Sequence, residues 1–250
     1  MNALIRAEAR KLQTTRTFWA ITLGTLALVA VAVTAASVAS RFTPGDHPAL
    51  QVFALAGLAQ TFAFILGVLA VTSEFRHGTI TTALLITPRR TPLLTAKLIT
   101  LTASGLGLGL LAFGETAAIV LPVLAARHIA SQTDGATVAG IIAGGAIAAA
   151  LAAALGVGIG AVVRSQTGAI ITALGLLYIL EPVLSILPGT GDAVQRFGLG
   201  GLTSGISGTS GFPSSAHLLQ PVPAALTLGA YALAVLTAGM MLFLRRDIAA

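Results

Sequence analysis

The sequence has few charged residues and no cysteine, and each absence excludes a class of protein. Asp, Glu, Lys and Arg make up only 9% of the 250 residues, whereas a soluble domain has about 25%. A soluble globular enzyme is therefore excluded. Without cysteine the chain has no disulfides, no thiolate metal sites and no cysteine nucleophile. What it has instead is 56% hydrophobic residues and a mean hydropathy of +0.94, which indicates that its solvent is the lipid bilayer.

The familiar motifs of catalysis and nucleotide binding are also missing from the sequence. There is no G-x-x-x-x-G-K-[ST] loop for ATP phosphates, no H-E-x-x-H pair and no G-x-S-x-G nucleophile. The histidines are spread over predicted loops, and no two share a helix at the spacing of metal ligands: His47, His77, His128 and His217. We therefore expect no metal site, no cofactor bound by this chain and no catalytic residue.

Six apolar stretches are long enough to cross a bilayer, which takes about 20 helical residues. Four of them contain no charged residue, and the third and fifth carry one acid each, Glu115 and Glu181. The sequence thus predicts an all-α integral membrane protein with one transmembrane domain over residues 1–250. The predicted spans are residues 18–39, 50–72, 98–126, 136–163, 168–187 and 224–244.

The distribution of basic residues predicts which way the spans point. Loops rich in Lys and Arg stay on the cytoplasmic side of a membrane. Most of the 14 basic residues lie before span one, between spans two and three, after span four or after span six, which places both termini in the cytoplasm. The net charge of +6 follows from this topology, so it requires no nucleic-acid partner.

Two segments outside the spans are predicted to form short helices. In residues 1–16, Leu4, Ile5, Ala9 and Leu12 recur at helical spacing, which favours an elbow helix lying in the membrane interface. This elbow either contacts a cytosolic partner or only anchors the topology. The external loop, residues 188–223, is rich in Gly and Ser but interrupted by apolar residues. We expect one or two short helices there, between residues 194 and 207.

The cytoplasmic segment 74–90, between spans two and three, is the most informative part of the sequence. Gly78 permits a break after span two, Thr79 can cap a new helix, and Pro88 ends it. Ile80 and Leu84 then share one face at i, i+4. Such a small surface must pack on the bundle or on another protein, because it cannot fold alone. The alternative is a solvated loop whose basic residues only set the topology.

Within the spans, two acids and three glycines stand out. Glu115 and Glu181 are costly in a membrane, by at least about 2.5 kcal/mol near its centre. They indicate either a polar cavity or proton site, or structural acids that are protonated, hydrated or ion-paired, with Arg127 as a candidate partner. Gly156, Gly158 and Gly160 allow close approach of helices, within the chain or between two copies.

Together these features resemble a type-2 ATP-binding cassette (ABC) transporter permease. The resemblance is carried by the six spans, the basic elbow helix, and the segment Glu74-Phe75-Arg76-His77-Gly78-Thr79 followed by Pro88-Arg89-Arg90. Weaker elements are the glycines at 156–160, the Glu181-Pro182 pair, and the Phe-Gly-Leu-Gly-Gly-Leu stretch that begins at Phe197.

The resemblance implies a function and a set of partners. Glu74, Arg76, Gly78 and Thr79 would open a coupling helix that Pro88 closes. A separate cytosolic ABC ATPase, present in two copies and carrying ATP and magnesium, would dock on this helix. A second permease copy, in a homodimer or a heterodimer, would complete an exporter of amphipathic drugs, peptides or lipids. Abundant Ala and Gly with few Lys suggest a bacterial gene, and hence the plasma (inner) membrane.

Two rival functions are a proton-coupled carrier or channel that uses Glu115 and Glu181, and a non-transporting membrane scaffold.

Overall fold

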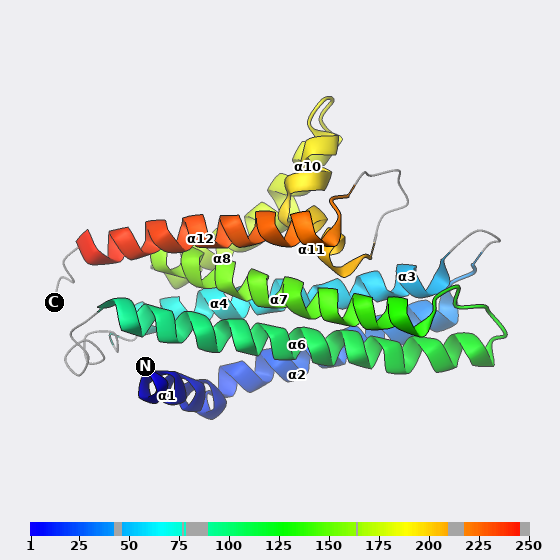
Figure 1. Ribbon diagram of the computed structural model, residues 1–250, viewed down its shortest axis with the longest axis horizontal. Coiled ribbons are helices and arrows are strands. Elements are labelled where there is room, and N and C mark those ends of the chain that lie inside the picture. The colour runs from blue at the N-terminus through cyan, green and yellow to red at the C-terminus, as the bar shows by residue number, and fades with distance from the viewer. Residues whose placement is uncertain (43–46, 77, 79–89, 164, 210–217, 246–250) are drawn as a thin grey trace.

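The computed structural model describes residues 1–42, 47–76, 78, 90–163, 165–209 and 218–245. In these residues the chain forms helices and no strands, and the long helices lie side by side in one elongated bundle (Figure 1). Six helical stretches are long and apolar enough to cross a membrane. The predicted all-α architecture with six spans is therefore confirmed.

The helices follow one another in the order of the predicted segments. The first half contains α1 (Asn2–Thr14), α2 (Arg16–Ala39), α3 (Pro48–Phe53), the short η1 (Ala54–Gly57), α4 (Leu58–Arg76) and α6 (Arg90–Ala126). The second half contains α7 (Gly135–Val163), α8 (Gln166–Gly175), the π-helical η2 (Leu176–Leu180), α9 (Glu181–Ile186), α10 (Gly191–Phe197), α11 (Leu199–Ser207) and α12 (Pro221–Arg245).

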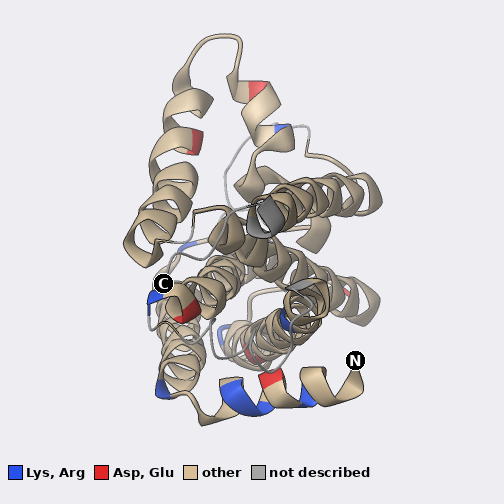
Figure 2. Ribbon diagram, turned by 90° about the vertical axis from the view of Figure 1, so that its left-hand side faces the viewer, with Lys and Arg blue, Asp and Glu red and all other residues tan. Residues whose placement is uncertain are grey.

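Helix α1 lies across one end of the bundle rather than along it (Figure 2). The corner between α1 and α2 is Thr15, whose backbone is extended. Trp19 braces this corner, because its indole N–H donates to the carbonyl of Gln13 at 2.7 Å. We call this end the basic end. It is formed by α1, the last turn of α4, the first turns of α6 and the end of α12.

Helix α7 is the centre of the bundle. Among the candidate spans it has the most buried apolar window, at 72%, whereas the fifth span has the least, at 11%. The helix can be central because it is built largely from Ala and Gly, which let neighbouring backbones come close. A Cβ added at Gly156 would lie 2.1 Å from the carbonyl oxygen of Phe64, and one at Gly67 would lie 2.2 Å from that of Ala153. The contact between α4 and α7 is therefore made by backbone against backbone.

The second and third spans continue past their predicted ends. Helix α4 runs to Arg76 instead of ending at residue 72, and α6 begins at Arg90, eight residues before the predicted start. A helix can extend beyond the hydrocarbon layer until a backbone breaker intervenes. Gly78 is such a breaker, with a φ of 66°, which favours glycine.

At the opposite end of the bundle, a side chain caps the start of α7. Asp134 accepts the backbone N–H of Thr137 at 2.9 Å and so caps the start of α7. Hydrogen bonds from the Thr137 side chain and backbone lower the pKa of Asp134. The short helices α10 and α11 stand in the predicted external region, and α10 points away from the bundle (Figure 1).

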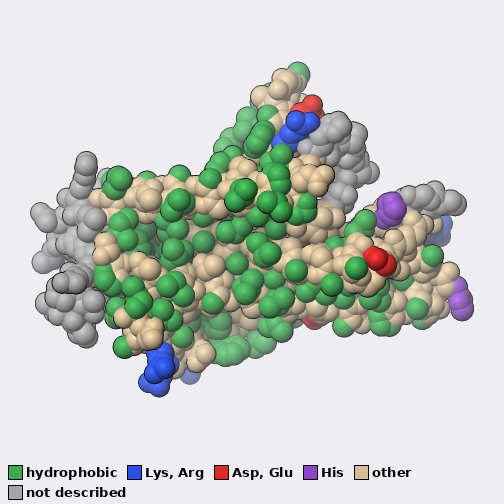
Figure 3. All heavy atoms as spheres, viewed as in Figure 1, with side chains coloured by type: hydrophobic (Ala, Val, Ile, Leu, Met, Phe, Trp, Pro, Cys, Tyr) green, Lys and Arg blue, Asp and Glu red, His purple; other side chains and the backbone are tan. Residues whose placement is uncertain are grey.

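Hydrophobic side chains are spread along the visible side of the bundle, and the Lys and Arg side chains at its lower left lie at the basic end (Figure 3).

Candidate functional site

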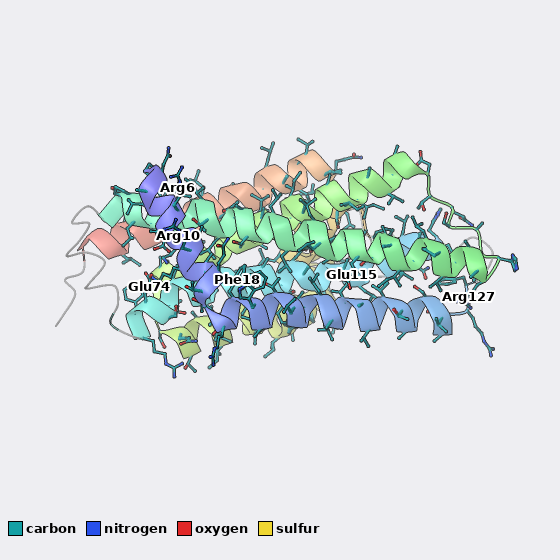
Figure 4. All side chains as sticks on the ribbon, turned by 90° about the horizontal axis from the view of Figure 1, so that it is seen from below. Arg6, Arg10, Phe18, Glu74, Glu115 and Arg127 are labelled. Atoms are coloured by element: carbon teal, nitrogen blue, oxygen red, sulfur yellow. The ribbon has the colours of Figure 1, made fainter. Side chains whose placement is uncertain are left out.

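The basic end contains a buried cluster of charged side chains from three separate helices. The Lys97 ammonium on α6 donates to Glu8 Oε2 on α1 at 2.7 Å and to Glu74 Oε1 on α4 at 3.1 Å. Lys11 on α1 also pairs with Glu74. We call these four residues the charge cluster. Figure 4 shows Glu74 beside α1 at this end of the bundle.

Burial raises the free-energy cost of leaving any charge of the cluster unpaired. The side chains of Lys97 and Glu74 are 5% and 4% exposed, whereas that of Lys11 is 48% exposed. Each carboxylate faces at least one ammonium group. With two glutamates and two lysines, the cluster is neutral overall. A buried charge costs several kcal/mol unless it is paired. The four residues therefore fix the position of α1 against the end of α4 and the start of α6.

Two neighbours of the cluster extend this connection toward the fifth span. Arg76, on the last turn of α4, donates to Gln166 Oε1 at 3.0 Å. Gln166 is the first residue of α8, which Ser165 caps by accepting the backbone N–H of Gly168 at 3.2 Å. The Arg76 side chain is exposed, so its charge stays accessible at the basic end.

The predicted coupling residues separate into two groups in the structure. Glu74 and Arg76 belong to the last turn of α4, and Gly78 follows in an exposed turn. Glu74 is buried, so it supports the segment rather than presenting a surface to a partner. The other four, Thr79, Ile80, Leu84 and Pro88, lie outside the described residues.

Sequence reasoning overlooked Glu8 and Lys97 as members of this site. Glu8 had a recognisable signal, because it is four residues from Leu4 and four from Leu12 and so falls among the apolar positions of α1. A charged residue on a buried face needs a partner of opposite charge. Its partner could not be identified from spacing, because Glu8 and Lys97 are 89 residues apart.

The suggested pairing of Glu115 with Arg127 is wrong. The Arg127 guanidinium donates to the backbone carbonyls of Ser37 and Ser40, the latter at 3.0 Å, and so closes the C-terminal end of α2. Arginine near a helix C-terminus satisfies carbonyls that have no partner within the helix. Figure 4 shows Glu115 in the middle of the bundle and Arg127 at the end opposite the charge cluster. Among the described residues, Glu115 Oε2 is buried with no hydrogen-bond partner.

Glu181 caps the first turn of α11. Its carboxylate accepts the backbone N–H groups of Leu199 and Gly200, the latter at 3.0 Å. These are the first residues of α11, and a carboxylate at a helix N-terminus satisfies free N–H groups and complements the helix dipole. Glu181 follows the π-helical η2, so a wider turn precedes Pro182. No hydrogen bond joins Glu115 to Glu181 in the described part of the chain.

The three glycines of α7 that the sequence singled out, Gly156, Gly158 and Gly160, all face helices of the same chain. A Cβ at Gly156 or Gly160 would meet the backbone of α4, and one at Gly158 would lie 3.0 Å from the backbone nitrogen of Leu236 on α12. They are packing positions within the bundle. Among the described residues, no group of three His, Asp or Glu is placed to hold a metal ion.

The sequence was compared with models of protein families. The model for the ABC-2 family transporter protein matches residues 4–181, which covers α1, the first four spans and most of the fifth. The chain belongs to the ABC-2 transporter family. Membership makes it a multi-pass membrane protein and a permease subunit of an ABC transporter, and it implies an ABC ATPase as a partner. No curated protein matches the chain.

In this ABC-2 permease, the charge cluster lies beside the predicted coupling segment. The segment between α4 and α6 is the part that the sequence motif predicts to be a coupling segment. The cluster joins both helices that flank this segment, and ties them to α1. The cluster therefore holds three helices together at the basic end.

Proposed function

We propose that this ABC-2 permease is the membrane subunit of an ATP-driven exporter of an amphipathic substrate. Two copies of a cytosolic ABC ATPase dock on the segment after α4 and bind ATP and magnesium, and this chain binds neither. The observation that supports the proposal is the buried bridge from Lys97 to Glu8 and Glu74. It joins α4 and α6, the helices that flank the docking segment, to the elbow helix α1.

The coupling is a shift between two arrangements of the spans. Closure of the ATPase dimer over ATP favours one arrangement, because its docked surface fits that arrangement better. The charge cluster transmits the shift, because moving one helix away from the others would leave buried charges without their partners. The bundle therefore moves with the docking segment instead of separating from it.

A second permease copy completes the exporter in this proposal, as a homodimer of this chain. The fifth span supports a further membrane-embedded contact, because it exposes Ile171, Tyr178 and Ile179 at 65%, 56% and 66%. Burial of only 11% of this span by its own chain leaves it to lipid or to a partner. The membrane is the plasma membrane of a bacterium.

Co-expression with a candidate ABC ATPase that co-purifies with the wild-type chain tests the proposed docking. The charge-inserting variant Leu84→Glu is expected to abolish co-purification of the ATPase and ATP-dependent transport. The matched control is Gln13→Glu, which adds the same charge at an exposed position of α1 and should leave both intact. Full assembly and transport by Leu84→Glu would contradict docking on this segment.

The rival carrier function is separated by the energy source. Glu115 is the residue that favours it, because its buried Oε2 has no partner among the described residues. A carrier would move substrate in liposomes that contain this chain alone under an imposed pH gradient, and Glu115→Gln would abolish that flux. The exporter proposed here transports only with its ATPase and ATP. A scaffold would transport under neither condition.

A further inference from the structure

A cavity of about 380 Å³ opens beside the charge cluster, between α1, α2, α4 and the start of α8. Its size lies within the range of small-molecule sites, about 300–1,000 Å³. Its deeper wall is apolar, formed by Phe18 and Ile21 of α2 and by Leu66 and Leu69 of α4. Its rim at the basic end carries Lys11 from α1 and Arg76 from α4. Figure 4 shows Phe18 and Glu74 in this half of the bundle, on the same side as α1.

The charges that line the cavity leave one positive charge in excess. Three cations and two carboxylates line it: Lys11, Arg76, Lys97, Glu8 and Glu74. Both carboxylates are paired with the two lysines. Arg76 donates to the neutral amide of Gln166, and no carboxylate pairs with it within the described ranges. One monoanion would therefore balance the rim.

The donors at the rim suit a phosphate group. A guanidinium can bind two phosphate oxygens at once through parallel N–H groups. The Lys11 ammonium has three N–H donors, so it can bind Glu74 and still donate to a ligand. These two cations approach from different helices, so a phosphate between them would join α1 to α4.

We propose that the cavity holds the headgroup and the first part of the acyl chains of one resident glycerophospholipid, which carries a net negative charge and comes from the cytoplasmic leaflet. The phosphate lies between Lys11 and Arg76, and the acyl chains follow the apolar wall along Phe18 and Leu69. Basic pockets between membrane helices on the cytoplasmic side bind anionic headgroups in this way. The lipid is a structural ligand that stays in place and is not transported. The inference requires only that the chain spans a membrane, and it stands even if the proposed exporter function fails.

Native mass spectrometry of the purified full-length chain tests this site. The protein is reconstituted in an equal mixture of phosphatidylglycerol, which is anionic, and phosphatidylcholine, which is zwitterionic, and is then released into detergent. We expect one phosphatidylglycerol retained per chain, in preference to phosphatidylcholine by about tenfold. Both lipids carry the phosphate, but phosphatidylcholine also brings a choline cation beside the cationic rim, and this repulsion lowers its affinity. Equal retention of the two lipids, or no retained lipid, would overturn the proposal.

Three variants distinguish a built site from general attraction to anionic lipid. Arg76→Gln removes the excess charge, and Ala70→Phe fills the cavity from its lining; both should lose the retained phosphatidylglycerol. Arg10→Gln removes the same charge from an exposed position of α1 outside the cavity lining, and should retain it. An equal loss in Arg10→Gln would show diffuse attraction and sink the idea of a site.

Occupation by a second copy of the chain is the other possible outcome. A cysteine placed at Thr17, which lines the cavity, would then cross-link to its counterpart in membranes, and no lipid would be retained. That result would overturn the lipid assignment. A retained lipid in wild type with no cross-link at Thr17 supports it.

Discussion

At the scale of single residues, Lys97 is the most demanding position in the chain. Its ammonium is buried between two carboxylates from different helices. Removing one member of a buried ion pair leaves an uncompensated charge in a medium that solvates it poorly. Lys11 contributes to the same cluster, but its side chain is half exposed, so water replaces much of what it provides.

Lys97→Met should therefore lower the free energy of unfolding by about 3–5 kcal/mol, whereas Lys11→Met should lower it by about 1 kcal/mol or less. Thermal unfolding of the purified variants in the same detergent measures the difference. The triple variant Glu8→Gln, Glu74→Gln, Lys97→Met removes all the charges that Lys97 serves, and should recover most of the lost stability. Equal losses in the two single variants would contradict the assignment of Lys97 as the buried centre.

Glu181 illustrates a second residue whose role is decided by its contacts. Its two oxygens accept N–H groups at the start of α11, so Glu181→Ala leaves that helix start without its cap. We expect faster amide hydrogen exchange at Leu199 and Gly200, with transport reduced only through disorder of the external helices.

Glu181→Gln is the matched control for this prediction, because its amide oxygen can still accept one N–H group. It should protect α11 more than Glu181→Ala does. If Glu181→Gln instead stopped all transport while the exchange of α11 stayed as in the wild type, a proton-carrying role would be favoured over capping.

At the scale of helices, the contact between α4 and α7 depends on glycine. Gly156→Ala would place a methyl group 2.1 Å from the carbonyl oxygen of Phe64, far inside van der Waals distance. The helices must separate, at a cost of about 1–3 kcal/mol. Reduced thermal stability and reduced yield of folded protein in detergent are the expected results.

Gly107→Ala on α6 provides the control, because nothing lies within 4 Å of a Cβ at that position. It should leave stability unchanged or raise it slightly, since alanine favours a helix over glycine by up to about 1 kcal/mol. Comparable destabilisation by both substitutions would mean that helix propensity, and not packing, controls the effect of Gly156.

At the scale of the whole molecule, the orientation in the membrane follows from the position of the basic residues. The basic end carries α1 and the ends of α4, α6 and α12 (Figure 1). Basic segments remain on the cytoplasmic side. Because the chain contains no cysteine, single cysteines can report the side on which each end lies.

A membrane-impermeant maleimide should label Ala130→Cys in intact cells and Gln13→Cys only in inverted vesicles. Both positions are exposed, and they belong to opposite ends of the bundle. Permeabilised cells provide the control, because both cysteines should react there. Labelling of Gln13→Cys in intact cells would reverse the topology and would remove the docking segment from the reach of a cytosolic ATPase.

The sequence alone determined the spans, because a bilayer demands about 20 apolar helical residues for each crossing. It also predicted short helices before the last span, from breaks in that pattern. The docking segment, indicated by the Glu-x-x-x-Gly-Thr motif, lies largely outside the described residues and stays a prediction. It was wrong in offering Arg127 as a partner for Glu115, because the Arg127 guanidinium donates to the carbonyls of Ser37 and Ser40 instead.

Only the tertiary structure decided which charged groups meet. Glu8, Glu74 and Lys97 belong to three helices, and their contacts span up to 89 residues of sequence. Hydropathy and helical spacing describe each segment separately, whereas a buried ion pair depends on how segments pack against one another. The bilayer dictates the number and length of the helices, and close packing around the small residues of α7 determines which of them become neighbours.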